Sequence, residues 1–409
     1  MAETVGIERL GHEGDGIAET STGPLYVPFT LPGESVSVEI DGARGALAAI
    51  LAPSPERTNP LCRHFGQCGG CALQHWADDP YSEWKRQQVV AALAQRGIAV
   101  DVLPLVRIPA GARRRAIFSA ATTDEGAVLG FHRRASKEIL AISECPILTP
   151  ALVAALPMLR RLAAQIMGQR GAAQLTVLAA DNGLDISAKS AAAGRSHAMS
   201  ALSSFAASEP TIARLTVDGE ELLRARLPEL RQDGISLFPT PGGFVQASAT
   251  AELVMAQAVA EALGERGPYA DLFAGIGTFA LRLAKSGPVL AVENEATALA
   301  ALDHGARQTR GLKAITTRRR DLFRNPLAAV ELKGFAGVVF DPPRAGAKAQ
   351  AEALATSSVP RLAAISCNPA SFSRDARILI DGGYRLISVL PVDQFHFSPH
   401  VELVAGFVR

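Results

Sequence analysis

The chain has 409 residues, a length that predicts two or three domains with ample hydrophobic cores. Of these residues 48% are hydrophobic and 20% are charged, and the formal net charge is +1, so any nucleic-acid surface must come from local clusters. No apolar run is long enough to cross a bilayer, and the acidic, Gly-rich start is unlike a signal or transit peptide. We therefore expect a cytoplasmic protein that does not enter membranes, with five cysteines that are reduced, metal-bound or catalytic.

Residues 1–55 predict a small all-β module. Short apolar runs at 5–10, 25–29 and 34–40 are separated by glycine and proline turns. About five such strands suit an OB-like barrel, a fold that often binds oligonucleotides. Residues 1–60, however, hold nine Asp or Glu and three Lys or Arg, which argues against strong phosphate binding by this module. A proline-rich linker follows.

Four of the five cysteines form a candidate metal site. Cys62, Cys68 and Cys71 follow a C-x5-C-x2-C spacing, and Cys145 lies far downstream. Glycines before Cys71 let the backbone wrap closely round a cluster, and four thiolates are the usual ligands of a [4Fe–4S] cluster or a structural zinc ion. The spacing favours a closed [4Fe–4S] cluster, because zinc sites more often contain two Cys-x2-Cys halves. Zinc and unrelated buried thiols are the alternatives.

Residues 56–245 predict a central α+β domain. A helix is expected from Asp79, acting as its cap, and Pro80 to about Arg96. Hairpins are expected at 124–126 and 181–183, and a second helix at about 150–168. Two basic clusters lie in this region, either as phosphate contacts or as solvated faces. They are Arg113, Arg114 and Arg115, and Arg133, Arg134 and Lys137.

Residues 246–409 alternate between helices and strands and predict a doubly wound, Rossmann-like α/β domain. After a helix at 249–263, the expected strands are 269–274, 289–293, 314–317, 337–340, 362–367 and 385–390. A basic stretch between Asp303 and Asp321 is the best candidate for a phosphate-binding face, with plain solvation as the alternative. Its members are Arg307, Arg310, Lys313, Arg318, Arg319 and Arg320.

The loop after the first strand of this domain is a candidate nucleotide site. Gly275-x-Gly277 follows a strand and opens a helix, so a ligand can approach the backbone closely. Glu293 ends the next strand, where an acid can bind ribose hydroxyls. Dinucleotides and S-adenosylmethionine both fit, but two further acids favour S-adenosylmethionine: Asp271 could meet its ammonium and Asp321 its adenine amine. Each acid alone could equally be a helix cap.

Cys367 follows a short apolar strand and precedes Asn-Pro, which places it at the sheet edge where ligands bind in this fold. Taken alone, a buried core thiol is the commoner interpretation. Asp341-Pro342-Pro343-Arg344 ends the neighbouring strand. Methyltransferases that act on exocyclic amines tend to have an aromatic residue at the position of Arg344. The arginine, together with an available cysteine, favours carbon as the methylated atom.

Carbon 5 of a pyrimidine is a poor nucleophile, so methylation there needs a thiolate and a base. A thiolate that adds to C6 makes C5 enolate-like, and a base must then remove the C5 proton so that the thiol can leave. We expect Cys367 to be the nucleophile. Glu402, an acid in an otherwise apolar run, is the candidate base, and His400 is its competitor.

With these residues in place, the chain resembles the S-adenosylmethionine-dependent RNA uracil-C5 methyltransferases. The members of this family modify transfer RNA or 23S ribosomal RNA, and the ribosomal branch has an iron–sulfur cluster. The resemblance covers nearly the whole chain. Its motifs are the four cysteines Cys62, Cys68, Cys71 and Cys145, the stretch from Gly130 to Cys145, Phe244-Val245-Gln246, the stretch from Asp271 to Gly277, Asp341-Pro342-Pro343-Arg344, Ser366-Cys367-Asn368-Pro369 and His400-Val401-Glu402.

The resemblance implies that Cys367 is the nucleophile, that Glu402 removes the proton, and that Phe244 stacks on a flipped uracil. It implies that Gln246 and Asp341 contact both the base and the cofactor. The other cofactor-binding residues would be Asp271, Phe273, Gly275, Glu293 and Asp321. Residues 1–55 would form a TRAM-type RNA-binding barrel, and the helix at 80–96 would pack on the catalytic domain. The expected partner is RNA, ribosomal rather than transfer RNA, bound by a monomer.

The sequence departs from the family pattern at Ser248, where Asn is usual, at Ala274, and in the acidic character of the barrel. The last departure shifts the expected RNA contacts towards the basic clusters. Three alternatives remain: a transfer RNA substrate, a methyltransferase for a protein or an exocyclic amine, and a non-catalytic RNA-binding iron–sulfur protein.

Overall fold

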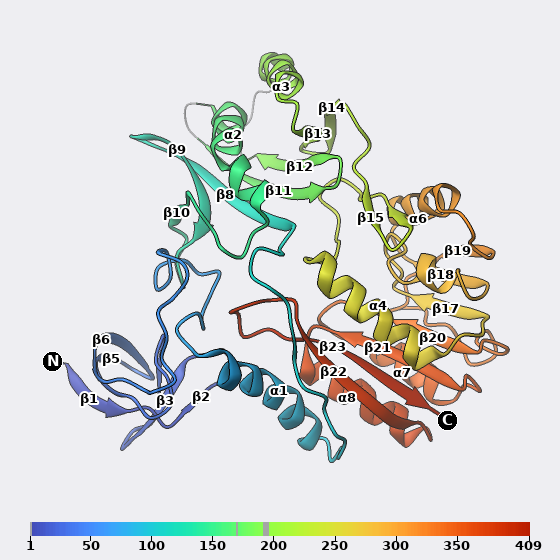
Figure 1. The fold of residues 1–409 in the computed structure, drawn as a ribbon, viewed down its shortest axis with the longest axis horizontal. Helices are drawn as coiled ribbons and strands as arrows, with labels where there is room; N and C mark the ends of the chain where they lie inside the picture. Colours follow the sequence, from blue (N-terminus) through green and yellow to red (C-terminus); the bar gives the residue numbers. More distant parts are fainter. Residues whose placement is uncertain (1, 169–170, 191–195) are drawn as a thin grey trace.

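The structure, a computed structural model, describes residues 2–168, 171–190 and 196–409. Figure 1 shows an N-terminal β unit, a central sheet and a C-terminal sheet with helices on both faces. In the N-terminal unit, six strands form one sheet in the order β1-β5-β6-β4-β3-β2. They are β1 (Glu3–Gly6), β2 (Arg9–Leu10), β3 (Gly16–Thr20), β4 (Gly23–Val27), β5 (Ser35–Asp41) and β6 (Arg44–Ala52). Gly16 is required, since a Cβ there would lie 2.1 Å from Thr30 Oγ1.

Helix α1 (Asp78–Ala94) lies on the C-terminal sheet although it precedes the central domain in sequence. Tyr81, Lys85, Val89 and Leu93 are buried at intervals of four residues, the spacing that puts them on one face of a helix. The helix begins one residue before the expected cap: Ala77 is the N-cap, and Asp79 lies within the first turn. Asp79 therefore favours the helix as a negative charge near its N-terminus and not as a cap.

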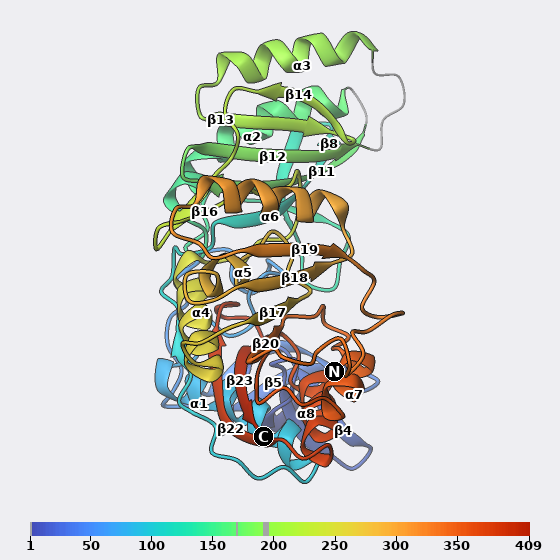
Figure 2. The same cartoon turned by 90° about the vertical axis from the view of Figure 1, so that its right-hand side faces the viewer.

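The central domain is a seven-stranded sheet in the order β10-β9-β8-β11-β12-β13-β14. Helices α2 (Pro150–Met167) and α3 (Ser196–Ser208) cover one of its faces and share its apolar core (Figures 1 and 2). The strands are β8 (Arg115–Thr123), β9 (Gly126–His132), β10 (Ile139–Ala141), β11 (Ala172–Ala180), β12 (Gly183–Ser190), β13 (Ile212–Val217) and β14 (Glu220–Arg224). A hairpin of β15 (Leu230–Gln232) and β16 (Ile235–Leu237) leads towards the C-terminal domain.

The C-terminal sheet has the order β19-β18-β17-β20-β21-β23-β22-β7. The first five strands are parallel, and β23 runs antiparallel to both neighbours. The strands are β17 (Tyr269–Leu272), β18 (Val289–Glu293), β19 (Ile315–Arg319), β20 (Gly337–Phe340), β21 (Arg361–Ser366), β22 (Arg385–Asp393), β23 (Glu402–Val408) and β7 (Val106–Arg107). This arrangement confirms the predicted α/β fold class. Strand β23 was not predicted as a strand, although its apolar run resembles those of the predicted strands.

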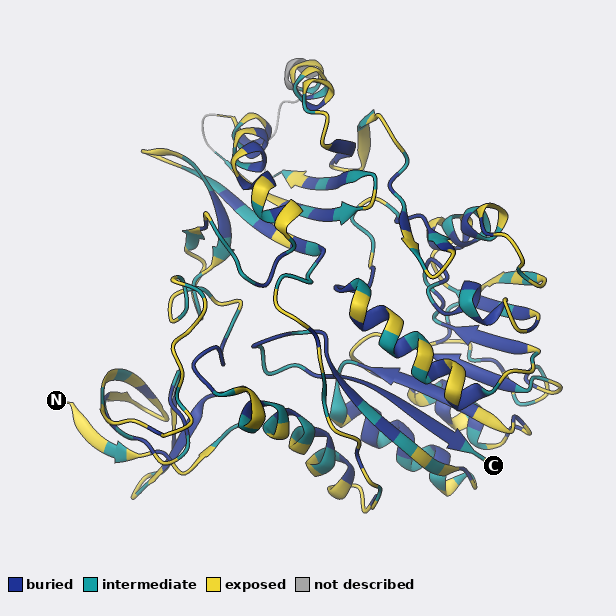
Figure 3. Ribbon diagram, viewed as in Figure 1, coloured by how far each residue is buried: buried dark blue, intermediate teal, exposed yellow. Residues whose placement is uncertain are grey.

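Two helical layers enclose this sheet. One apolar cluster joins it to α4 (Ala249–Leu263), α5 (Ala280–Leu283) and α6 (Ala296–Gln308), and another joins it to α1, α7 (Lys348–Ala355) and α8 (Pro369–Asp381). Burial from both faces explains the continuous apolar runs of the strands, such as the fully buried β20 (Figure 3). In the described part of the chain, no helix combines the length and apolar character needed to cross a membrane.

Candidate active site

A cleft of about 1370 Å³ lies between the central and C-terminal sheets. It opens at the carboxyl ends of the parallel strands, the edge where open α/β sheets bind ligands. Ser187, Lys189 and Thr216 line it from the central sheet. From the C-terminal domain the cleft is lined by Phe273, Gly275, Glu293, Asp321, Asp341, Cys367 and Glu402, with Phe244 and Gln246 from the segment before α4.

The glycine loop opens onto this cleft, as the sequence predicts. Gly275 has φ +54°, and a Cβ there would meet no heavy atom within 4 Å, so its backbone faces open space. Gly277 has φ +94°, and a Cβ there would lie 2.7 Å from Leu302 Cγ. The first glycine thus allows close approach by a ligand, and the second allows close packing of the loop on α6.

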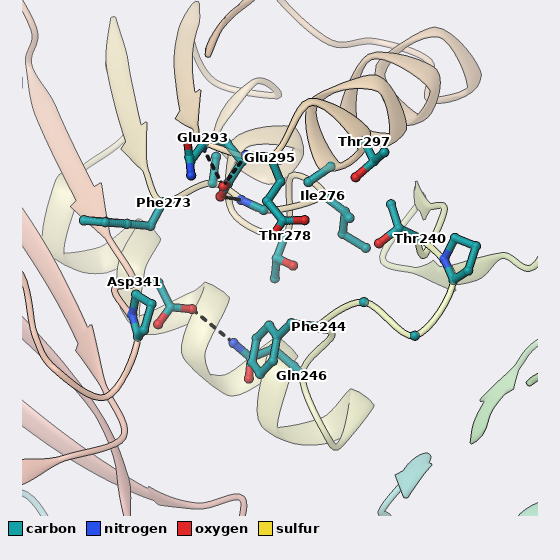
Figure 4. Close-up of a pocket in the computed structure, with 18 of the residues that line it drawn as sticks. Thr240, Phe244, Gln246, Phe273, Ile276, Thr278, Glu293, Glu295, Thr297 and Asp341 are labelled. Atoms are coloured by element: carbon teal, nitrogen blue, oxygen red, sulfur yellow. Dashed lines mark hydrogen bonds between the residues drawn. The ribbon is translucent and has the colours of Figure 1, made fainter. Parts of the chain in front are cut away.

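Glu293 ties the loop to the start of α6. Its Oε2 accepts a hydrogen bond from Gly275 N at 3.0 Å, and its Oε1 accepts from the backbone N–H of Asn294 at 2.6 Å and of Glu295 at 2.9 Å (Figure 4). The carboxylate therefore stays at the cleft wall, held in one orientation. Asp321 lies farther along the same wall, where its Oδ1 accepts from Phe323 N at 3.0 Å.

Two aromatic rings form part of this wall. The ring centroids of Phe273 and Phe323 are 5.3 Å apart, and the Phe323 side chain is half exposed to the cleft. Sequence reasoning missed Phe323, although its place directly after Asp321-Leu322 was a signal. Such a pair offers an apolar surface on which a purine ring can pack.

Asp271 does not line the cleft. The side chain lies within β17 with no exposed surface, and burial, together with the negative charges of Asp341 and Glu293, raises its pKa well above the ordinary value. The expected direct contact with a ligand ammonium therefore has no geometric support.

Register brings the two expected catalytic residues together. Strand β23 runs antiparallel to β21 with Leu403 opposite Ser366, so Glu402 at the start of β23 lies beside Cys367 just after β21. Both line the cleft. Burial and the negative charges of Glu402 and Asp341 raise the pKa of the Cys367 thiol to about 11, despite the opposing charge of Arg344. Burial and the charge of Asp341 also raise the pKa of Glu402.

His400, the competing base, is not among the residues that line the cleft. Its ring packs edge-on against Phe395 with a centroid distance of 6.1 Å, and burial lowers its pKa. The geometry therefore favours Glu402 as the base.

Hydrogen bonds connect Asp341 to Glu402 through two glutamines. Gln246 Nε2 donates to Asp341 Oδ2 at 3.2 Å (Figure 4). Gln394 Nε2 donates to Gln246 Oε1 at 2.8 Å and to Glu402 Oε2 at 3.2 Å. Burial raises the pKa of Asp341 to about 7, although the bond from Gln246 opposes this. Sequence reasoning missed Gln394, and no local pattern marks it.

Phe244 stands at the mouth of this group. Its ring is 70% exposed and lines the cleft, which leaves it free to stack on a flat ligand. The segment that bears it is held from behind by Arg114, whose Nε donates to Gln246 O at 3.1 Å and whose NH2 group contacts Glu252 at 2.5 Å. Ser248, where the family has Asn, caps α4 by accepting from Ala251 N at 3.4 Å.

The five arginines of the first two basic clusters make contacts within the protein, whereas Lys137 is exposed, and phosphate binding there stays a prediction. Arg114 is buried on Glu252, Arg115 reaches Gly242 O at 3.4 Å, and Arg113 donates to Arg115 O at 3.0 Å. Arg133 pairs with Glu138, and Arg134 reaches Asp15 of the N-terminal unit at 2.5 Å. Arg114 and Arg134 thus link different domains, a role that sequence spacing cannot distinguish from a solvated face.

The third basic stretch divides into two parts. Arg318 and Arg320 both pair with Glu331, and Arg320 also lines the cleft. Arg307, Arg310 and Lys313 are exposed at the end of α6 and in the loop before β19. This stretch stays a candidate phosphate-binding face.

The four cysteines of the candidate metal site come into one neighbourhood. Burial raises the pKa of Cys71 to about 12, and the other three thiols, Cys145, Cys68 and Cys62, raise it further as negative neighbours. All four are partly exposed and unpaired as disulfides. Within the described ranges, however, no three His, Cys, Asp or Glu side chains are arranged to hold a metal ion. The structure therefore gathers the expected ligands without forming a coordination site.

Comparison with known proteins identifies the family to which the chain belongs. Residues 235–407 match the model described as tRNA (Uracil-5-)-methyltransferase, and residues 3–48 match the TRAM domain. An uncharacterized RNA methyltransferase of Brucella suis is 48% identical over 98% of this chain and 97% of its own length. The 23S rRNA (uracil(1939)-C(5))-methyltransferase RlmD of Vibrio cholerae is 32% identical over 100% of this chain and 96% of its own length.

A solved structure shares the whole fold. The tRNA (uracil-54, C5)-methyltransferase of Pyrococcus abyssi, in complex with S-adenosyl-L-homocysteine, is 22% identical with a TM-score of 0.77. The match covers 99% of each chain. At this identity the likeness supports the fold and leaves the substrate open.

Proposed function

Because the chain belongs to the S-adenosylmethionine-dependent RNA uracil-5-methyltransferases, we propose that it methylates one uridine of 23S ribosomal RNA through a covalent bond between Cys367 and C6 of the base. The observation that carries the mechanism is the position of Glu402 beside Cys367 at the cleft wall, with Asp341 and Gln246 next to them. Membership of this family excludes a non-catalytic protein and a methyltransferase for proteins or amines.

The thiolate of Cys367 adds to C6 of the uracil, and the electron pair of the C5–C6 double bond moves towards C5 and the O4 carbonyl. S-adenosylmethionine supplies an electrophilic methyl group, which C5 then takes. Glu402 removes the remaining proton from C5, the double bond reforms, and Cys367 leaves as a thiolate. Asp341 and Gln246 are placed to bind the polar edge of the base, and the exposed ring of Phe244 to stack on a base flipped into the cleft.

The cleft wall formed by the glycine loop and the ends of β18 and β19 fits S-adenosylmethionine. The open backbone at Gly275 allows a ligand to approach closely, Glu293 presents a held carboxylate for ribose hydroxyls, and Asp321 presents one for an adenine amine. Phe273 and Phe323 provide the apolar surface beside them.

Ribosomal RNA is the proposed substrate because the 32% identical relative is named for it and matches over the full chain. The uridine equivalent to uracil 1939, the position in that relative's name, is the first position to test. We infer that the enzyme acts in the cytoplasm as a monomer. Mapping 5-methyluridine in cellular RNA with and without the gene tests this proposal. Loss of the modification from a transfer RNA alone would favour the alternative substrate.

RNA substituted with 5-fluorouridine tests the chemistry. Glu402 can remove a proton from C5 but not a fluorine atom. The covalent adduct between Cys367 and the fluorinated uracil is therefore trapped. We expect a covalent complex with wild-type protein and none with Cys367→Ala, while the fold, measured by circular dichroism, is unchanged. A wild-type protein that methylates the RNA but forms no such complex contradicts the covalent mechanism.

A [4Fe–4S] cluster held by Cys62, Cys68, Cys71 and Cys145 is also proposed, as a structural group. Two observations support the fit: the other three thiols are close enough to Cys71 to raise its pKa, and the partly buried Arg113 is close enough to Cys145 and Cys71 to interact with them, where a cation would offset thiolate charge. Anaerobically purified protein should contain iron and sulfide and absorb broadly near ~400 nm. Stoichiometric zinc without that absorption would establish the zinc alternative.

A further inference from the structure

Gln394 is a buried residue that touches the proposed base without lining the cleft. Its side chain is 5% exposed, and its Nε2 donates to Glu402 Oε2 at 3.2 Å and to Gln246 Oε1 at 2.8 Å. Among the described residues of the proposed chemistry, Gln394 alone forms hydrogen bonds to both Glu402 and Gln246. The geometry points to Gln394 as the positioning residue of the proton-removal step, an inference that rests on the proposed covalent mechanism.

The loop that holds Gln394 is fixed from outside the site. Asp393 accepts a hydrogen bond from Tyr81 Oη at 2.8 Å and forms an ion pair with Lys85, both from helix α1. Lys85 also donates to Phe395 O at 3.0 Å, and Phe397 N donates to Tyr81 Oη at 2.9 Å. Helix α1 therefore immobilises the backbone on both sides of Gln394, which a positioning residue requires.

The hydrogen bond does two things to Glu402. It holds one carboxylate oxygen at the back of the site, which leaves the other for the C5 proton. It also favours the ionised form, because an N–H donor stabilises a carboxylate, against burial and the charge of Asp341, both of which raise the pKa of Glu402. Without Gln394, Glu402 stays protonated to a higher pH and removes the C5 proton more slowly.

Other charges around Glu402 are accounted for. Asp341 faces it from β20, Cys367 from the end of β21, and Arg344 lies near Cys367. On α4, which packs on β23, Glu252 is committed to Arg114 and Arg282. On β22, Asp393 is committed to Lys85, and His396 on the following loop lies 3.3 Å from Asp393. Gln394 is thus the uncharged side chain that donates a hydrogen bond to the Glu402 carboxylate.

The reaction order provides a test that a merely structural role would not satisfy. Addition of Cys367 and methyl transfer precede the step that needs Glu402. In Gln394→Met, which keeps the side-chain size but has no donor, we expect 5-fluorouridine RNA to be trapped at the wild-type rate. On ordinary RNA, kcat should fall roughly tenfold at pH values below the pKa of Glu402. The acid limb of the plot of kcat against pH should move upward by about one pH unit. Methylated RNA bound covalently to the protein should accumulate.

Gln350→Met is the matched control. Gln350 is also a fully buried glutamine, and it makes two hydrogen bonds to the backbone of Leu327, remote from the cleft. Its loss should lower thermal stability and leave the kcat profile in place. If Gln394→Met does not fold, Gln394→Glu replaces it, because this variant keeps the side-chain shape and adds a negative charge. The acid limb of its kcat profile should move upward in the same way.

Unchanged turnover and pH profile in Gln394→Met overturns the inference. Equal loss of trapping and turnover also overturns it, since the defect would then lie before proton removal. Failure of the wild-type protein to trap 5-fluorouridine RNA at all overturns the proposed covalent mechanism instead, so the two failures are distinguishable.

Discussion

Cys367 is the residue on which the proposed chemistry depends, and burial and two neighbouring acids keep its thiol protonated at neutral pH. Its thiol is flanked by the carboxyl groups of Glu402 and Asp341, and its pKa is about 11. The positive charge of Arg344 acts in the opposite direction and lowers the pKa of the Cys367 thiol. The sequence position of Arg344, directly after two prolines, did not indicate this role.

The reactivity of Cys367 in the free enzyme should rise with pH. Because only the thiolate reacts and its pKa is raised, alkylation by iodoacetamide should be slow at pH 7 and accelerate up to about pH 11. Arg344→Met removes the opposing cation, raises the pKa further, and should slow alkylation at every pH below it. Mass spectrometry of the peptide that contains Cys367 measures this rate. Equal rates in the two proteins at pH 8 would show that Arg344 does not act on the thiol.

The two loop glycines should respond differently to the same substitution. In Gly275→Ala the new methyl group projects into open space at the cleft, so S-adenosylmethionine affinity should fall while stability drops by about 1 kcal/mol. In Gly277→Ala the methyl group meets Leu302 and the backbone is strained, so stability should fall by about 2–4 kcal/mol. Calorimetric titration and thermal unfolding separate these effects. A larger loss of stability in Gly275→Ala would contradict the assignment.

At the scale of elements, helix α1 is the support of the active-site loop. It packs on α8 and β22, and its Tyr81 and Lys85 reach Asp393 from sequence positions more than 300 residues away. Lys85 and Asp393 both have no exposed surface. A buried ion pair of this kind contributes little net stability, but removal of one partner leaves the other charge unpaired.

Lys85→Met should therefore destabilise the protein by about 3–5 kcal/mol, because Asp393 would be left as an uncompensated buried charge. Thermal and urea-induced unfolding measure the loss. Lys348→Met is the matched control: Lys348 forms an exposed pair with Glu352 at 3.9 Å, and its removal should change stability by less than about 0.5 kcal/mol. The double variant Lys85→Met with Asp393→Leu should recover part of the loss, and no recovery would argue against charge burial as the cause.

At the scale of the whole molecule, the central and C-terminal sheets line one cleft, which is the proposed entry for RNA. Lys189 is exposed on the central sheet and lines the cleft opposite the catalytic wall. The N-terminal unit, by contrast, is acidic and uses Asp15 to bind Arg134. These placements favour RNA phosphate contacts in the cleft over contacts on the outer face of the TRAM unit.

Lys189→Glu should weaken binding of the cognate RNA roughly tenfold at low salt and reduce the salt slope of the affinity by about one, the value for loss of one phosphate contact. Lys333→Glu is the control, since Lys333 is exposed before β20, at the sheet edge away from the cleft. Fluorescence anisotropy at several salt concentrations measures both. If Arg307→Glu weakens binding and Lys189→Glu does not, the RNA follows α6 and not the cleft.

Sequence reasoning identified what local pattern determines. Apolar runs ended by Gly, Pro or Asp predicted the strands of the C-terminal sheet, and residues at strand ends such as Glu293, Asp341 and Cys367 line the cleft because carboxyl ends of parallel strands share one edge. The predicted helix at 249–263 is α4 without change. Strand β23 is an apolar run of the same kind and was missed, because it was interpreted only as the apolar surroundings of Glu402.

The sequence by itself determined the fold class, the family and the residues with the required chemistry, since these depend on period, spacing and residue type. Tertiary structure alone decided how each residue is used. It buried Asp271 inside the sheet, turned Arg114 and Arg134 inward as links between domains, and placed Gln394 between Gln246 and Glu402. These outcomes depend on which side chains meet once the sheets and helices have packed, and no local pattern contains that information.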